Sequence, residues 1–225
     1  MVSPRPPRPV TKLTRPITPE RVVATALDIA DKDSLRAVTL GRVARELGCH
    51  VTSLYTHIES IDDLFERMAL AAMSELANEL WAVALGRSGD DAVLAIARVQ
   101  RTYSGRHPGR VQAMHASPGS GSLALDDAAL RLAEPIRAVL RSHGLDDAQV
   151  RHAHRIFSAM TRGFVQGEAA GAYARGFPGA PEGSSGADAT FDHMVELFLL
   201  GLRSGHWPRA QGSPVPANNS RERGN

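Results

Sequence analysis

The side chains best able to do covalent chemistry in this 225-residue sequence are one cysteine and nine histidines. Cys49 directly precedes His50, and a thiolate beside an imidazole could act as a nucleophile. Neighbouring residues in a turn rarely point at each other, and no oxyanion-hole loop, phosphate-binding loop, dinucleotide-binding glycine pattern or nucleophile elbow is recognisable. We therefore expect Cys49 to pack in a core, with a redox-sensing thiol as the alternative. The sequence predicts that the protein is not an enzyme.

The histidines do not have the spacing of metal ligands. His152 and His154 lie two residues apart in a helical stretch, so their side chains diverge by about 200°. The sequence has no pair of histidines four residues apart and no second cysteine. We expect neither a metal site nor another cofactor. His115 and His154 stay open as hydrogen-bonding groups for a small molecule, beside roles in the core or on the surface.

A third group of chemically useful residues follows Cys49, where compact side chains between His50 and Thr56 could approach a nucleic acid closely. Serine and threonine can bond bases or phosphates, and a valine can touch a thymine methyl group. Residues 39–58 predict two short helices that meet at a turn containing Gly48, which is the helix-turn-helix pattern. In that motif the first helix crosses the DNA backbone and the second enters the major groove. The alternative is an ordinary helical hairpin in a core.

The elements that must position this motif are helices throughout, because apolar residues keep a helical period and no hairpin pattern occurs. Thr18, Thr39 and Ser60 are predicted N-caps, and Gly48 is the predicted end of a helix. We expect an all-α fold of about nine helices. The predicted spans are 19 to about 31–34, 39–48, 50–57, 60–86, 90–104, a short piece after 108, 126–142 with a break or bend at Pro135, 146–173 and 188–204.

Composition divides the chain further. Residues 1–17 are rich in proline and basic residues and predict a disordered basic arm, and residues 206–225 predict a disordered polar tail. We assign residues 18–65 to a DNA-binding domain and residues 66–205 to a ligand-binding and dimerisation domain. The sequence is 43% hydrophobic, which is enough for a core, and has no run of about 18 apolar residues. We expect a cytoplasmic protein that does not associate with a membrane.

The stretch from Thr18 to about Met68 resembles the DNA-binding domain of the tetracycline-repressor (TetR) family. The similarity rests on a long first helix, on the stretches Val43–Gly48 and Leu54–Ile58, and on Asp63–Phe65 at the start of the next helix. It implies a homodimer that binds double-stranded DNA at a palindromic operator. One position departs from the family: Ile61 stands where many members have a lysine that meets phosphate, so one backbone contact could be missing. The basic arm could compensate for it.

The helix-turn-helix and the resemblance together predict which side chains meet DNA. We expect Tyr55 and His57 to bond phosphates, and Thr39 and Arg42 to meet the DNA backbone from the first helix of the motif. The residues expected to face bases are His50, Val51, Thr52, Ser53 and Thr56.

The C-terminal part also resembles one branch of the family, over Phe157–Ala170 and Phe191–Leu202, with Arg162 where that branch often has a histidine. This similarity implies that the last two long helices dimerise as a four-helix bundle. The stretch Val195–Leu202 is apolar nearly all round, which one monomer alone would leave partly uncovered. The predicted dimer residues are Phe191, Val195, Phe198, Leu199 and Leu202.

The resemblance further implies a ligand pocket inside the C-terminal domain. Large apolar and aromatic side chains suit such a site, although each of them could simply fill the core. The candidate pocket residues are Trp81, Tyr103, Met114, His115, Phe157, Met160 and Phe164. The sequence thus predicts a dimeric transcription regulator, a repressor released by an unknown, mostly apolar inducer. The alternatives are a helical enzyme and a protein-binding adaptor without specific DNA binding.

Overall fold

The computed structural model of the protein describes residues 16–116, 121–173 and 186–204. Apart from Pro16 and Ile17, the predicted basic arm lies outside the described residues, as do the predicted tail and the glycine-rich stretches at 119–120 and 176–185. Within the described ranges the fold contains nine α-helices and no strand, which confirms the predicted all-α class. None of the described helices is both long enough and apolar enough to cross a membrane.

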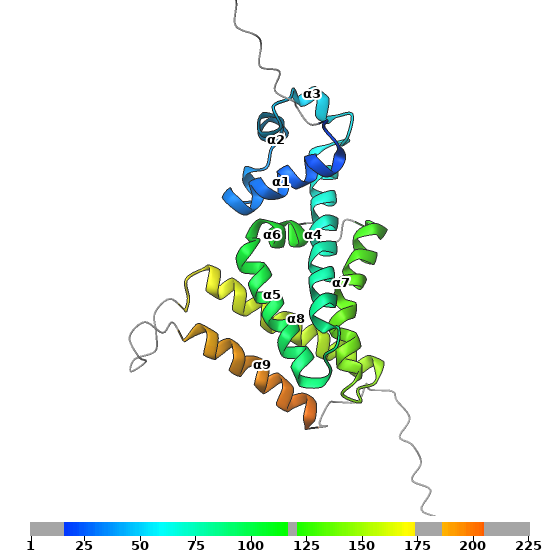
Figure 1. The fold of residues 1–225 in the computed structure, drawn as a ribbon, viewed down its shortest axis with the longest axis vertical. Helices are drawn as coiled ribbons and strands as arrows, with labels where there is room; N and C mark the ends of the chain where they lie inside the picture. The colour runs from blue at the N-terminus through cyan, green and yellow to red at the C-terminus, as the bar shows by residue number, and fades with distance from the viewer. Residues whose placement is uncertain (1–15, 117–120, 174–185, 205–225) are drawn as a thin grey trace, which may run out of the picture.

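The helices form one elongated molecule, with α1, α2 and α3 at one end and α9 toward the other (Figure 1). The N-terminal group is α1, α2 and α3, with a short 3-10 turn, η1 (Leu35–Ala37), between α1 and α2. The remaining helices follow α4, which extends from this group into the rest of the molecule. Their bounds are α1 Pro19–Asp33, α2 Leu40–Leu47, α3 Val51–Leu54, α4 Ile61–Ala84, α5 Gly89–Arg106, α6 Pro108–Ala116, α7 Leu123–Arg141, α8 Asp147–Ala169 and α9 Ala187–Arg203.

Local capping chemistry sets the helix ends in the N-terminal group. The side-chain oxygens of Thr18, Thr39 and Ser60 each accept a hydrogen bond from the backbone N–H three residues later, at 3.3, 3.2 and 3.0 Å. Gly48 ends α2 with a φ of 69°, in the left-handed region that favours glycine. The three predicted N-caps and the predicted end at Gly48 are therefore confirmed.

Two helices differ from the prediction. The helix expected over residues 50–57 is a single turn, α3, followed by turn residues up to His57. Of the break or bend expected at Pro135, the break is wrong, because α7 runs through this residue as one helix. Pro135 is buried in the α7 face that packs on the core, and this packing offsets the hydrogen bond that proline cannot donate.

Two apolar clusters build the core. The N-terminal cluster joins α1, α2, α3 and the first half of α4, and it includes Met68, Ala72 and, from α6, Ala113. The C-terminal cluster joins the second half of α4 to α5, α7, α8 and α9. The boundary predicted between residues 65 and 66 thus falls inside α4, which is continuous and contributes to both clusters. As a result the two parts are joined by one continuous helix, α4.

Candidate DNA interface and ligand cavity

The pair α2 and α3 is held by apolar side chains on its inner side. Val43 and Leu54 are fully buried, and Ile58 is 1% exposed, so both helices are anchored on α1 and α4. Cys49 packs partly buried against the same cluster, as predicted. Ile61 also packs against it, so the residue that replaces the family's lysine serves the core.

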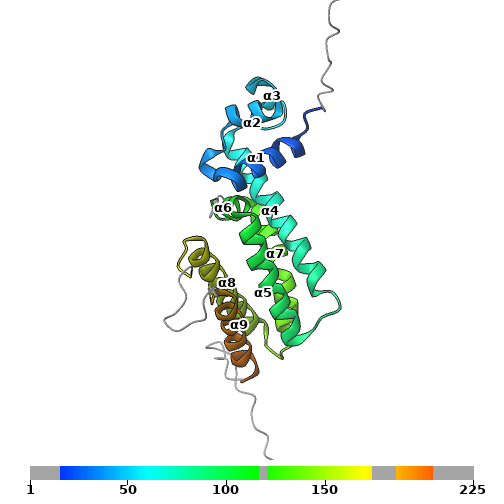
Figure 2. The ribbon, with the colours of Figure 1, turned by 60° about the vertical axis from the view of Figure 1, so that its left-hand side comes forward.

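The opposite side of α3 is open to solvent at the end of the molecule farthest from α9 (Figures 1 and 2). The side chain of Tyr55 is 56% exposed, and this face is free of other described elements. The predicted DNA-binding residues fall into two groups there. Those exposed are Thr39, His50, Thr52, Tyr55 and Thr56. Those partly buried are Arg42, Val51, Ser53 and His57.

Several of these side chains already have partners within the protein. The Thr56 hydroxyl donates to the Ser53 carbonyl at 2.7 Å, which fixes the turn after α3. The Arg42 guanidinium pairs with Asp33 at the end of α1, while its buried Nε has no partner among the described residues. Sequence reasoning missed Asp33, which orients Arg42 and competes with phosphate for it.

A cavity of about 410 Å³ lies between α4, α5, α6, α7 and α8. Apolar side chains such as Leu76 from α4 and Leu132 from α7 line part of it. A second hollow of about 570 Å³ shares Ser104, Val111 and His115 with the first and extends to Leu35 and Phe65 in the N-terminal part. Val111 and His115 lie on α6, so this short helix borders both hollows.

The structure brings only two of the seven predicted pocket residues, Met114 and His115, to the cavity of about 410 Å³ between the five helices. The prediction is corrected for the other five, because aromatic rings fill the spaces between helices. Tyr103 and Phe157 are fully buried in the C-terminal cluster, and Met160 packs against that cluster. Phe164 is stacked on Tyr173 with ring centroids 4.7 Å apart, and Trp81 is 41% exposed on the surface.

The two histidines whose role the sequence analysis left open, His115 and His154, both line the cavity. Burial lowers the pKa of His154 to about 4, and nearby Arg137 and Arg155 add to this effect. Burial also lowers the pKa of His115, with a smaller contribution from Arg162. Both imidazoles are therefore neutral near pH 7.

The sequence analysis missed six polar or charged residues that line the cavity: Gln100, Ser104, Ser158, Thr161, Arg162 and Gln166. Thr161 is 4% exposed although it is polar. It lies between Phe157 and Phe164, four residues after one and three before the other, on the buried face of α8. A polar residue inside such an apolar helical face is a sequence signal that could have indicated the cavity.

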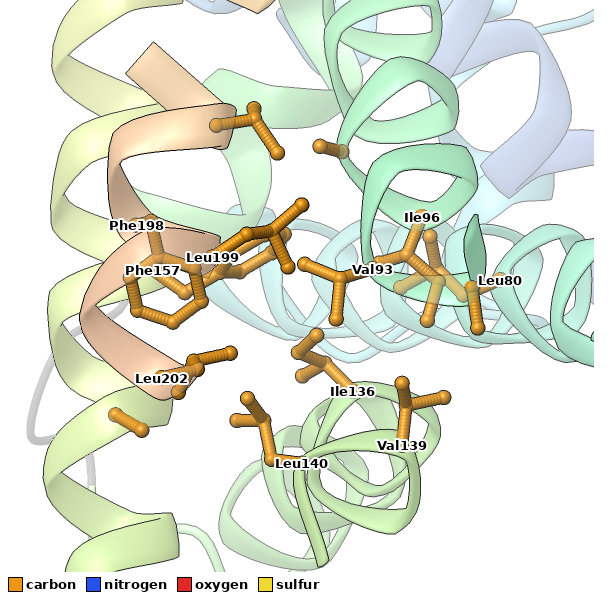
Figure 3. Packing of buried hydrophobic residues seen from close by; sticks show 14 of the residues in the cluster. Leu80, Val93, Ile96, Ile136, Val139, Leu140, Phe157, Phe198, Leu199 and Leu202 are labelled. Carbon is orange, nitrogen blue, oxygen red and sulfur yellow. The ribbon is translucent and has the colours of Figure 1, made fainter. Parts of the chain in front are cut away.

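The orientation of α9 also corrects a prediction. All five predicted dimer residues point into the monomer: Phe191, Val195, Phe198, Leu199 and Leu202 are at most 7% exposed. Figure 3 shows Phe198 and Leu199 directed toward neighbouring helices, and the Phe198 ring lies 5.6 Å from that of Phe157 on α8. The outer face of α9 instead carries Leu197 and Leu200, which are 69% and 50% exposed. Because the α9 stretch has no polar side, the sequence alone could not indicate which of its faces is buried in the monomer.

A cluster of charged side chains joins α6 to α1 and α4. The Arg110 guanidinium pairs with Asp31 on α1 and lies 3.2 Å from Glu75 on α4. The Arg110 backbone N–H also donates to Asp31 at 2.9 Å, and His107 Nδ1 lies 3.0 Å from the same carboxylate. The side chains of Arg110 and Asp31 are each only 14% exposed, so water screens this contact weakly.

The backbones of α1 and α6 touch directly beside this cluster. A Cβ atom added at Gly109 would lie 2.0 Å from the Ala30 carbonyl carbon, so only glycine fits there. The Gln112 side chain of α6 accepts a hydrogen bond from the Leu35 N–H at 3.2 Å. We call the charged cluster and this close contact the α1–α6 junction. Because α6 also lines the cavity, the junction connects the cavity wall to the DNA-binding helices.

Comparisons with known proteins agree with this arrangement. The family model described as "Tetracyclin repressor-like, C-terminal domain" matches residues 93–198. The uncharacterised HTH-type transcriptional regulator Rv0681 of Mycobacterium tuberculosis is 35% identical over 202 residues, which cover 88% of each chain. The HTH-type transcriptional repressor DrrR1 of Streptomyces coeruleorubidus is 31% identical over 154 residues, which cover 68% of this chain and 53% of that one.

Solved structures have the same fold. A possible TetR family regulator from Streptomyces coelicolor A3(2) superposes with a TM-score of 0.62 at 23% identity, covering 83% of this chain and 98% of that one. The Streptomyces coelicolor TetR family protein ActR, solved in complex with actinorhodin, superposes with a TM-score of 0.61 at 21% identity, covering 85% and 99%. The relatives are transcription regulators and not enzymes. With its exposed helix-turn-helix and this similarity over most of its length, the chain belongs to the TetR family of helix-turn-helix transcriptional regulators.

Proposed function

We propose that the protein is a homodimeric repressor in the cytoplasm that binds a palindromic operator and leaves it when a small, mostly apolar molecule fills the cavity. One observation carries this proposal: α6 lines the cavity and is joined to α1 at the α1–α6 junction. A molecule that displaces α6 therefore acts on the helices that hold α3. Operator binding is proposed from the exposed face of α3, and dimerisation from the exposed faces of α8 and α9.

The exposed side of α3 is suited to the major groove. Thr52 lies in the first turn of α3, where recognition helices usually contact base edges. Tyr55 follows the helix and is exposed, so its hydroxyl can donate to a phosphate and fix the orientation of the protein. Arg42 reaches the DNA backbone by exchanging Asp33 for a phosphate oxygen, which replaces one charged partner by another.

The dimer interface is proposed on the outer faces of α8 and α9, which lie side by side (Figure 2). On α9 the exposed Leu197 and Leu200 form an apolar strip, and on α8 Ile156 is 49% exposed. Ala159 and Gly163 lie on the exposed side of α8 with Ile156 and allow a partner helix to approach closely. Two copies of this surface would form a four-helix bundle and hold two α3 helices about one DNA turn apart, roughly 34–36 Å.

Release by a ligand is a population shift. The ligand must bind better to a conformation in which the two α3 helices are wrongly spaced than to the DNA-bound conformation. A tenfold loss of operator affinity needs about 1.4 kcal/mol of differential binding. The complex of ActR with actinorhodin supports a small-molecule site in the same fold.

Footprinting on the DNA that flanks the protein's own gene tests the proposal. We expect a protected palindrome at low salt, and loss of protection when a compound that binds the cavity is added. A flank without any protected site would contradict operator binding. Protection that no cavity-binding compound changes would contradict ligand release and leave a constitutive DNA-binding protein.

A further inference from the structure

One edge of the cavity is polar, although most of its wall is apolar. Gln100 and Ser104 line it from α5, and Ser158 and Thr161 line it from the facing helix α8. Apolar side chains of α4, α6 and α7, such as Leu76, line most of the rest, together with the imidazole of His115 on α6. A molecule that fills the cavity must therefore place its polar group toward α5 and α8.

The polar groups at this edge differ in whether they already have partners. The Thr161 hydroxyl donates to the Phe157 carbonyl at 2.9 Å, and the Ser158 Oγ lies 3.3 Å from His154 Nε2. The Gln100 Oε1 is buried and has no hydrogen-bond partner among the described residues. A buried acceptor without a donor is unfavourable, so a ligand that draws the Gln100 amide toward the cavity and supplies the donor gains affinity from it.

The charges around the cavity also select among ligands. None of the described residues that line it is acidic, and the charged side chain at its edge, Arg162, is positive. Burial holds His154 and His115 in their neutral forms near pH 7. An organic cation would lose its hydration without finding a carboxylate, and Arg162 would repel it.

We propose that the cavity selects an uncharged, mostly apolar molecule with a hydroxyl group that donates a hydrogen bond to Gln100 Oε1, and that it rejects organic cations. This inference rests on the proposed function, in which the cavity is the inducer site. It adds the chemical class of the inducer and names the side chain that recognises it.

Three probes with one biphenyl skeleton test the proposal by calorimetry at pH 7: 4-phenylphenol, its methyl ether and 4-phenylbenzylamine, which is cationic. We expect the phenol to bind about tenfold more tightly than the ether, because only the phenol can donate to Gln100. The amine should bind at least tenfold more weakly than the phenol. In the Gln100→Met variant, which removes the acceptor at similar volume, the phenol and the ether should bind equally.

Gln166→Met is the matched control, because Gln166 lines the same cavity from an exposed position and should leave the tenfold preference intact. A second variant, Gln100→Glu, supplies a negative charge and should improve binding of the amine at least tenfold. This variant keeps the test decisive if Gln100→Met does not fold.

Four results would overturn the inference: equal binding of phenol and ether to the unaltered protein, an unchanged preference in Gln100→Met, tight binding of the amine, or binding of no probe at all. Tighter binding of 4-phenylbenzoate than of the phenol would overturn the uncharged class. Footprinting with the same protein preparations separates failure of this inference from failure of the proposed function. Operator protection without the expected probe preferences rejects the ligand class and leaves operator binding intact.

Discussion

Replacing Gly109 by alanine should damage the α1–α6 junction. The new Cβ would lie 2.0 Å from the Ala30 carbonyl carbon and 2.3 Å from the Asp31 nitrogen, both of them backbone atoms that cannot rotate away. An ordinary contact begins near 3.4 Å, so the two helices must separate by roughly 1.4 Å, the difference between 3.4 and 2.0 Å. That shift would break the 2.9 Å hydrogen bond from the Arg110 N–H to Asp31.

The expected loss of stability follows from these two effects. Overpacking costs about 1–3 kcal/mol, and a broken, partly buried hydrogen bond to a carboxylate costs about 1 kcal/mol or more. The unfolding free energy should therefore fall by about 2–4 kcal/mol. For a chain of this length the melting temperature should fall by roughly 5–15 °C at fixed protein concentration. Differential scanning calorimetry measures both quantities.

Gly105→Ala is a matched control with the opposite expected sign. Gly105 is exposed in α5, and an added Cβ there has no atom within 4 Å. Alanine in a helix is more favourable than glycine by about 0.5–1 kcal/mol, so this variant should melt slightly higher than the unaltered protein. The reasoning fails if Gly109→Ala melts at the temperature of the unaltered protein, or if both variants lose the same stability.

Three further predictions concern DNA, assembly and pH. Tyr55→Phe should weaken binding to all DNA sequences alike, by about tenfold for each lost phosphate bond, whereas Thr52→Ala should change the preference between sequences in a binding-site selection assay. Leu200→Glu should convert the dimer to monomer in sedimentation experiments, while Leu123→Glu, at an 84% exposed position on α7, should leave it dimeric. Because the pKa of His154 is lowered to about 4, the unfolded chain binds a proton more readily than the folded one, and the free energy of unfolding should fall as pH drops from about 6.5 to 4. In His154→Gln the number of protons taken up on unfolding in this pH range should be smaller by up to one per chain.

The parts of the fold that depend on short-range chemistry were predictable from the sequence. Thr39 and Gly48 set the ends of α2 through one hydrogen bond and one backbone angle, and neither needs a distant partner. The apolar positions Val43 and Leu54 then fix which face of the helix-turn-helix is buried and leave Tyr55 exposed. Local signals therefore sufficed to identify the candidate DNA interface.

The inner faces of the C-terminal helices could not be predicted in the same way. Phe198 and Leu197 are neighbours in an apolar stretch, and only the positions of α5 and α8 decide that the first is buried and the second exposed. Likewise Phe157 and Met114 are both large apolar residues, and only the packing of five helices leaves space beside the second. Cavities depend on the packing of distant segments, which hydrophobic periodicity does not contain.

The energies at the α1–α6 junction match those that a ligand-controlled regulator requires. A tenfold change in operator affinity corresponds to about 1.4 kcal/mol, and one hydrogen bond to a charged group contributes about 1.5–3 kcal/mol. A ligand that shifts Met114 or His115 on α6 enough to lengthen the contacts between Arg110 and Asp31 would therefore suffice for release. Gly109 strengthens this argument, because the close backbone contact at Ala30 leaves α6 no room to move toward α1 without moving α1 as well. Beside the continuous helix α4, the junction is thus a second connection between the two parts of the molecule, and it links the cavity wall to the helices that hold α3.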